Sequence, residues 1–308
     1  MIAVIFYFKP MFLDPVNLFS LLESAAFPGV LAIGMVFVLA LREIDLSVGW
    51  MFHLSAVFAA LLMAADVAPW LAALAGVLLG AGLGLINGLV AVTLRLPALV
   101  VTLGTYAMFQ GLSEGLDKGQ AIIPTDKSSS FFSALSGKLF GVLPVSAFVF
   151  IALALAMHVV LHRTRFGYRV QAVGSNPEAA VYAGIPTGWV RLQTLMLMGA
   201  ISGLAGVMYL GFRGAIGPSE GSDFMLVAIA AVIIGGTPLS GGRGTVIGAV
   251  FGMMIVQVIL SGMSFFGIDA TWRTFVIGAV TVAALALDWL IKLERNRRFE
   301  RSREKPRA

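Results

Sequence analysis

Long apolar stretches separated by short polar breaks make up most of this 308-residue chain. Most of them approach the length of about 20 residues that a helix needs to cross a bilayer. We expect spanning helices at about residues 20–41, 48–65, 70–93, 97–113, 143–162, 189–213, 223–237, 244–263 and 271–290. Met1–Leu13 is apolar but short, and the helix-breaking pair Asp14-Pro15 follows, which predicts either a clipped first helix or a true start upstream. The pattern indicates an all-α polytopic membrane protein of about ten transmembrane helices, the first short or truncated.

One long internal interval, Arg163–Arg191, breaks this apolar pattern and contains a short helix with both ends marked. Asn176 is a favourable N-cap, and Pro177 suits the first helical position, where a missing N–H costs nothing. Glu178 follows in the first turn, where a carboxylate complements the helix dipole. Gly184 predicts the end of the helix. A helix of about two turns cannot span a bilayer, so we expect it at a membrane surface, available to a partner.

The composition agrees with a membrane protein, because only 12% of residues are charged, against about 25% in soluble domains. The chain has no cysteine, which excludes disulfides and thiolate metal sites. Residues 292–308 hold eight Lys/Arg and three Glu, which accounts for the net charge of +5. We therefore divide the chain into a transmembrane domain, 1–291, and a basic cytosolic tail, 292–308, that lies beside membrane lipids and indicates no nucleic-acid partner.

The distribution of Lys and Arg along the chain also predicts its orientation in the membrane. If the interval 163–191 faces the cytosol, alternation of the spans places 15 of the 21 Lys/Arg on that side. This asymmetry satisfies the positive-inside rule and places both termini in the cytosol. Arg213, Glu220 and Asp223 then flank an outer loop, either as contacts for an external partner or as ordinary interface charges.

Two glycine-containing patterns predict packing and symmetry. Residues 45–49 and 238–242 share L-S-x-G, each between an inward-running and an outward-running apolar segment, which indicates a parallel internal repeat. Glycines also recur every fourth residue, a spacing that allows helices to approach closely. Such ladders serve packing within the chain, a subunit interface or the lining of a pathway. The glycines assigned to packing and repeat are Gly80, Gly84, Gly88, Gly241 and Gly242.

Catalytic and nucleotide-binding motifs are nearly absent from the sequence. The sequence contains no phosphate-binding G-x-x-x-x-G-K-[ST] and no H-E-x-x-H. Gly111–Gly115 matches the hydrolase pattern G-x-S-x-G, but it ends an apolar helix, where that motif lacks its strand–turn–helix context. The polar groups within the spans are mainly neutral, which suits passage of an uncharged polyol, although each also suits hydrogen bonding between helices. They are Asn87, Thr102, Thr105, Gln110, Gln257 and Thr274.

The polar turn Arg42–Gly49 has two interpretations. It is either a cytosolic turn between spans or an unwound break that lines a cavity, since irregular backbone at membrane depth requires protein or water around it. Under either interpretation Asp45 and Ser47 are candidate caps of the next helix. We place both residues, with Asn87, Thr102, Thr105 and Gln110, among the candidates for a substrate pathway.

Together these stretches carry a resemblance. Residues 173–180 (VGSNPEAA) and 183–186 (AGIP) are similar to the coupling segment of ABC sugar-importer permeases of the ribose/xylose/arabinose branch, which also includes rhamnose and autoinducer-2 permeases. The string IDLSVG at 44–49, Asn87-Gly88 with Pro97 and TLGT at 102–105, and GGTPLSGGRG at 235–244 resemble further family motifs, in the family's order. The family commonly has Gly-Gly before IDLS, where this chain has Arg42-Glu43.

The resemblance implies a permease that pairs with a second copy or a paralogue, two cytosolic ATP-binding subunits and a periplasmic sugar-binding protein. ATP and Mg would be used by the partner subunits, and this chain would bind no cofactor. Asn176, Pro177, Glu178, Ala179, Ala180 and Gly184 would couple the ATPase to the spans, with the two alanines allowing close contact. The competing function is a self-contained carrier or channel for a small neutral solute, and a membrane enzyme is a more distant alternative.

Overall fold

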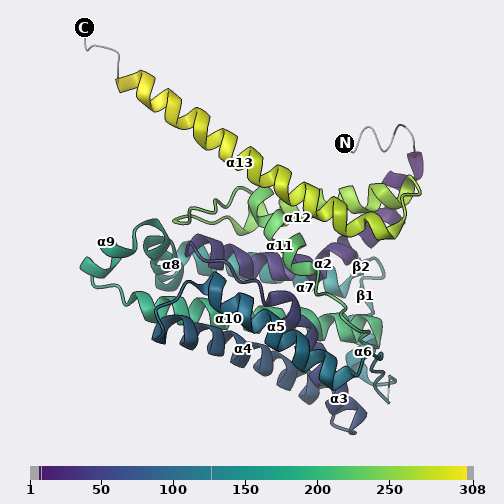
Figure 1. Ribbon diagram of the computed structural model, residues 1–308. Helices are drawn as coiled ribbons and strands as arrows, with labels where there is room; N and C mark the ends of the chain where they lie inside the picture. Colours follow the sequence, from purple (N-terminus) through teal and green to yellow (C-terminus); the bar gives the residue numbers. More distant parts are fainter. Residues whose placement is uncertain (1–6, 8, 126, 304–308) are drawn as a thin grey trace.

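A computed structural model describes residues 7, 9–125 and 127–303, and α-helices dominate this part of the chain (Figure 1). The helices are η1 (Pro10–Leu13), α2 (Pro15–Ala40), α3 (Val48–Ala64), α4 (Pro69–Thr93), α5 (Ala98–Asp117), α6 (Ser130–Leu135), α7 (Val145–Arg163), α8 (Arg165–Ser175), α9 (Pro177–Tyr182), α10 (Thr187–Arg213), α11 (Phe224–Ile234), α12 (Val246–Phe265), η2 (Ala270–Trp272) and α13 (Arg273–Arg303). A small antiparallel hairpin joins β1 (Lys138–Leu139) to β2 (Leu143–Pro144).

Helix α2 forms the centre of the bundle. It packs against α7, α10, α11 and α12, and every residue from Ala25 to Leu41 is buried. This segment carries no charged side chain, so burial on all sides costs no desolvation of charge. Figure 1 shows α4, α5 and α10 along one side of α2 and α12 and α13 along the other. Helices α8 and α9 lie at one end of the bundle, which we call the α9 end, and α6 and the hairpin lie at the far end.

The glycine ladder of α4 lies against α10. A Cβ atom at Gly80 would be 2.5 Å from the carbonyl oxygen of Gly199, and one at Gly88 would be 3.0 Å from the Cα of Leu192. Gly84, between them, faces the α10 backbone in the same way. Larger residues would push the two helices apart, so these glycines bring two backbones into direct contact within one chain.

The helices agree with the expected spans in position, and five of those in the described residues are long and apolar enough to cross a membrane: α2, α4, α7, α10 and α12. The stretch expected to span at 223–237 instead forms the 11-residue helix α11, which is about 16 Å long, half the hydrocarbon core. Gly235 and Gly236, the latter with φ +87°, end it early. Helix α13 continues through the expected domain boundary at 291/292. Of the expected first helix, residues 1–6 and 8 lie outside the described residues, and Pro10–Leu13 is a 3₁₀ turn.

Candidate functional site

The short helix α9 begins as its sequence predicts. Asn176 is the N-cap, and its Oδ1 accepts a hydrogen bond from the backbone N–H of Ala179 (3.0 Å). Pro177 occupies the first helical position, and Glu178 lies exposed in the first turn. Because these caps are local, they fix the start of α9 whatever the rest of the chain does.

The C-terminus of α9 is equally well defined. The N–H of Ile185 donates to the carbonyl of Ala180 (2.9 Å), and the N–H of Gly184 donates to the carbonyl of Val181 (2.9 Å). Gly184 has φ +75°, the left-handed conformation that this pair of bonds requires. A helix of six residues is marginal alone, so the two caps and the packing beneath it hold it in shape.

Helix α9 presents one face to the chain and one to its surroundings. Ala180 is buried in a small core with Ala40, Val170 and Val190, so it contributes to the fold and does not face a partner, contrary to its expected role. Ala179 is exposed, and Tyr182 is 92% exposed. A fully exposed aromatic ring next to a capped helix end is typical of a surface that a partner covers.

Backbone contacts fasten α9 on its N-terminal side. The N–H of Gly242, in the turn between α11 and α12, donates to the carbonyl of Ala40 at the end of α2 (2.9 Å). A Cβ atom at Gly242 would lie 2.9 Å from the Cα of Ser175, the last residue before the N-cap. A Cβ atom at Gly241 would lie 2.6 Å from the Cβ of Arg42. The second L-S-x-G segment therefore lies against the end of α2 and the start of α9, while the internal repeat itself stays a prediction.

An ion pair fastens the start of α10, the helix that follows α9. Arg191, in the first turns of α10, pairs with Glu43 at 2.7 Å, and each side chain is 18% exposed. Arg191 also donates to the carbonyls of Ala91 (3.1 Å) and Leu96, at the end of α4 and just beyond it. The other carboxylate oxygen of Glu43 accepts from the N–H of Ala98, at the start of α5 (2.7 Å). Burial raises the pKa of Glu43, and Arg191 and the N–H of Ala98 oppose that rise.

Directly after Glu43, the polar turn forms a buried hydrogen-bonded cluster. Asp45 Oδ1 accepts from both the N–H (2.8 Å) and the hydroxyl (2.7 Å) of Ser47. Asn87 Nδ2 donates to Ser47 Oγ (2.9 Å), and the N–H of Leu46 donates to Thr102 Oγ1 (3.1 Å). None of the four polar side chains is exposed. The turn is thus a non-helical break between α2 and α3 whose polar groups are buried, and Ser47 occupies the N-cap position of α3 without a capping bond from its side chain.

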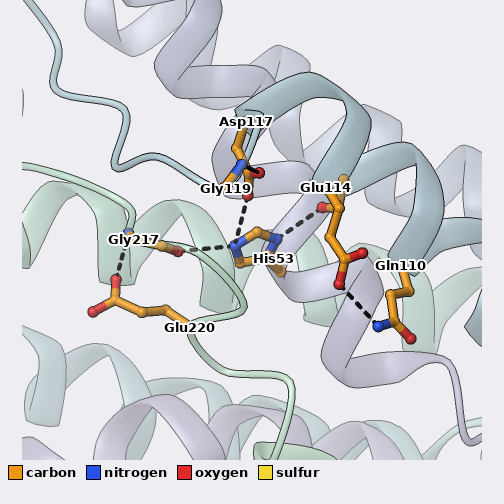
Figure 2. Close-up of polar contacts among 8 residues, drawn as sticks. His53, Gln110, Glu114, Asp117, Gly119, Gly217 and Glu220 are labelled. Atoms are coloured by element: carbon orange, nitrogen blue, oxygen red, sulfur yellow. Dashed lines mark hydrogen bonds and ion pairs between the residues drawn. The ribbon is translucent and has the colours of Figure 1, made fainter.

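The two remaining pathway candidates differ in position. Thr105 lies one turn beyond Thr102 on α5 and is 7% exposed, so it continues the buried polar cluster. Gln110 lies further along α5 and donates to Glu114 Oε1 (2.9 Å), away from the turn (Figure 2). Asp45, Ser47, Asn87 and Thr102 are buried, and their place in a substrate pathway stays a prediction.

A second polar cluster, centred on His53 of α3, lies towards the far end (Figure 2). Its Nδ1 accepts from the hydroxyl of Ser113 (2.7 Å), and its Nε2 donates to the carbonyl of Gly217 (3.0 Å), with Asp117 Oδ2 3.8 Å away. Gly217 belongs to the loop 214–223 that precedes the short helix α11, and its N–H donates to Glu220 (2.8 Å). The cluster holds this irregular loop inside the protein, against α3 and α5.

These residue types are those of a Ser-His-Asp triad, and Ser113 is the serine of the G-x-S-x-G match. The geometry excludes that chemistry. Ser113 lies within the continuous helix α5 and is fully buried, so no substrate carbonyl can reach it. A nucleophilic elbow needs a sharp strand-to-helix turn that exposes the hydroxyl.

Comparison with known proteins identifies the family of this chain. A family profile described as "Branched-chain amino acid transport system / permease component" matches residues 17–285. The chain belongs to this permease family. The ribose import permease RbsC of Bacillus subtilis (strain 168) is 34% identical over 288 residues, which is 94% of this chain and 89% of the relative. The D-allose permease AlsC of Escherichia coli (strain K12) is 33% identical over 91% of this chain and 85% of its own length.

The autoinducer 2 import permease LsrC of Yersinia enterocolitica (serotype O:8 / biotype 1B) is 34% identical over 91% of this chain and 77% of its own length. No solved structure matches the chain. The resemblance to permeases of ABC sugar importers is thereby confirmed. The family is a transporter family and not an enzyme family, and its members are multi-pass proteins of the bacterial inner membrane.

Sequence reasoning missed the part of this permease that joins α9 to the polar turn. Arg42-Glu43 was noticed only as a departure from the family's Gly-Gly. The partner of Glu43, Arg191, entered only as the end of the interval Arg163–Arg191. The available signal was weak: one acid directly before IDLS and one arginine at the end of that interval. A pair separated by 148 positions cannot be derived from local patterns.

Proposed function

We propose that this chain is the permease subunit of an ABC importer that carries a neutral monosaccharide or a related polyol across the inner membrane, driven by ATPase partners. The observation that carries the proposal is α9: a doubly capped helix, exposed on one face and fastened on both sides to the segments that close the bundle. Its relatives are import permeases for ribose, D-allose and autoinducer 2. The hydroxyls and carboxamide of Ser47, Asn87 and Thr102, which surround Asp45, are of the kind that suits an uncharged polyol.

Helix α9 would transmit the motion of an ATP-binding subunit. Glu178, Ala179 and Tyr182 would meet that subunit, whereas Ala180 and the caps would keep α9 rigid. Movement of α9 would pull on the end of α2 through Gly242 and on the polar turn through Arg191. Asp45, Ser47, Asn87 and Thr102 would separate as the two sides of the closed cluster move apart.

We infer that the α9 end faces the cytosol and that both chain termini lie there. Support comes from the arginines at this end. Three of them, Arg42, Arg95 and Arg191, line a single groove of about 360 Å³ that Pro177 of α9 also lines. Positive charge gathers on the cytosolic side of inner-membrane proteins. A second permease copy or a paralogue and a periplasmic sugar-binding protein would complete the importer.

Partner identification tests the proposal. The tagged permease, purified gently from native membranes, should bring down a stoichiometric ATP-binding subunit, and vesicles containing the complex should take up sugar only with ATP. Glu178→Arg and Gly184→Val should abolish uptake while leaving membrane insertion intact. Asp66→Arg, a matched charge reversal in an exposed residue of the loop between α3 and α4, should transport normally. Purification of the permease alone, with solute movement independent of ATP, would establish a carrier or channel instead.

A further inference from the structure

A polar groove opens at the far end of the bundle, between the first turns of α2, the last turns of α12 and the start of α13. Its volume is about 310 Å³. Figure 1 shows these three segments gathered at the end of the molecule opposite α8 and α9. The polar side chains that matter here are Ser24 of α2, Gln257, Ser261 and Ser264 of α12, and Arg273 of α13.

These five side chains are unpaired. Among the residues that the structure describes, none of them forms a hydrogen bond or an ion pair with another group. Hydroxyls in membrane helices commonly donate to the carbonyl one turn back. Ser202 of α10 does so at 2.9 Å and Thr281 of α13 at 2.8 Å. Of the four serines that line the groove, Ser20 also does so, to Val16 (2.9 Å). Ser24, Ser261 and Ser264 depart from this behaviour, so their hydroxyls are left available to something in the groove.

The groove extends along the bundle from its far end, where Gln257 and Ser261 are half-buried and Ser24 and Ser264 are exposed. Gln257 lies eight residues before the end of α12, about 12 Å along the helix. Ser24 lies nine residues after the start of α2, about 14 Å along its helix. An unpaired carboxamide exposed to lipid tails at this depth would cost several kcal/mol. The polar lining is therefore compatible with the fold only if water or a polar ligand fills the groove.

The short helix α11 is a neighbour of the helices that form the groove. It packs against α2, α12 and α13, the same three helices that contribute lining residues, and it is only about 16 Å long. The irregular loop 214–223 precedes it and turns inward to His53. The groove residues come from α2, α12, the turn after α12 and α13, so the groove lies beside this irregular segment at the far end of the bundle.

The lining residues indicate the chemical class of ligand that the groove would bind. The lining has four hydroxyls and two carboxamides, of which Asn17 and Ser20 donate to the carbonyls of Phe12 and Val16. The remaining three hydroxyls and one carboxamide can both donate and accept hydrogen bonds, which matches the alternating needs of adjacent sugar hydroxyls. The groove has no acidic lining residue, and Arg273 adds donors at its mouth. A volume near 300 Å³ is at the small end of ligand pockets, a size for one sugar ring. We propose that this groove is a binding site for one neutral, monosaccharide-sized polyol, where cargo rests between its delivery and its passage through the permease. This inference rests on the proposed function.

The absence of cysteine makes a direct test possible, because one Ser→Cys change creates the only thiol in the chain. Ser24→Cys, Ser261→Cys and Ser264→Cys, each in the complete importer in vesicles, are treated from the far side with a charged, membrane-impermeant methanethiosulfonate reagent. All three thiols should react. Ser202→Cys is the matched control and should stay unlabelled, because Ser202 is fully buried in α10.

The second measurement is protection by cargo. D-ribose, D-allose, L-arabinose and D-galactose are the probes, and potassium chloride of equal osmolarity is the control. A bound sugar present at about ten times its dissociation constant should slow labelling of the groove thiols roughly tenfold by mass action. In parallel, Gln257→Leu should lower kcat/KM roughly three- to tenfold through the lost hydrogen bonds, and by different factors for different transported sugars.

Two results would overturn the groove as a sugar site. Thiols that resist the charged reagent but react with a lipid-soluble maleimide would show that the groove faces lipid. Thiols that react but gain protection only from anionic phospholipid, in vesicles that import one of the four sugars, would show a lipid headgroup site. Vesicles that move these sugars without ATP would overturn the proposed function, and the groove's role with it.

Discussion

The ion pair between Glu43 and Arg191 gives the most demanding test of how α9 acts. Glu43→Ala removes the carboxylate that binds both Arg191 and the N–H of Ala98. Exposed pairs contribute up to about 1 kcal/mol, whereas breaking a fully buried pair costs about 3–5 kcal/mol. With both side chains 18% exposed, this pair lies between those limits. We expect Glu43→Ala to lower the free energy of unfolding by about 2 kcal/mol.

A double-mutant cycle separates the pair from its other contacts. Arg191→Ala also frees the carbonyls of Ala91 and Leu96, so its own cost includes groups unrelated to Glu43. The double variant should recover about 1–2 kcal/mol relative to the sum of the single variants, because the second change has no pair left to break. Denaturant unfolding of the purified permease in detergent measures all three variants under one condition.

Transport provides the functional readout of the same cycle. If Arg191 transmits the motion of α9 to the polar turn, each single variant should hydrolyse more ATP per sugar imported, in proportion to the lost coupling. The exchange Glu43→Arg with Arg191→Glu keeps the pair and should restore part of the ratio. Additive stabilities within about 0.5 kcal/mol, together with an unchanged ATP-to-sugar ratio, would refute the reasoning.

Three further predictions concern neighbouring features. Gly84→Ala should destabilise the protein by about 1–3 kcal/mol by pressing on the α10 backbone, whereas Gly82→Ala, with open space around its Cβ, should stabilise it slightly; unfolding in detergent compares the two. Arg42→Gly should stabilise by up to about 1 kcal/mol, because Arg42 holds φ +68°, and should leave uptake intact; loss of uptake would give its side chain a role. Ala180→Leu should lower stability by overpacking the core under α9, whereas Ala179→Leu should weaken only co-purification of the ATP-binding subunit; equal thermal stabilities would contradict this division.

Local signals in the sequence predicted the local structure well. The bounds of α9 follow from Asn176, Pro177 and Gly184, because caps and a left-handed glycine act within a few residues. Most span positions follow from apolar runs that end at charged or glycine-rich turns. The length of α11 was predicted wrongly, because its apolar residues continue to the edge of Gly235-Gly236 while its start depends on the loop 214–223. That loop is held in place by His53, far away in the sequence.

Contacts between residues far apart in the sequence decide which polar side chains lie together, and the sequence alone left this open. The polar residues of the spans were all candidates of equal standing, yet Ser47, Asn87 and Thr102 join one buried cluster while Gln110 and Gln257 lie elsewhere. Composition cannot separate a polar side chain that bonds a neighbouring helix from one that faces a groove, because both satisfy the same chemistry. Only the packing of α2, α4, α5 and α12 against one another decides which partner each side chain meets.

The two attachments of α9 differ in kind, and that difference bears on how the bundle opens. On its N-terminal side, the backbone of Gly242 lies directly against Ser175, so we expect this contact to move as a rigid unit. On its C-terminal side, a single arginine holds one carboxylate and two carbonyls, which can break and re-form over a few ångströms. A movement of α9 would therefore displace the end of α2 directly. It would displace the polar turn only after the bonds of Arg191 to Glu43 and to the two carbonyls break. If α9 couples an ATPase to the spans as proposed, the backbone contact would set the direction of the movement, and the ion pair would set the threshold at which the buried polar cluster separates.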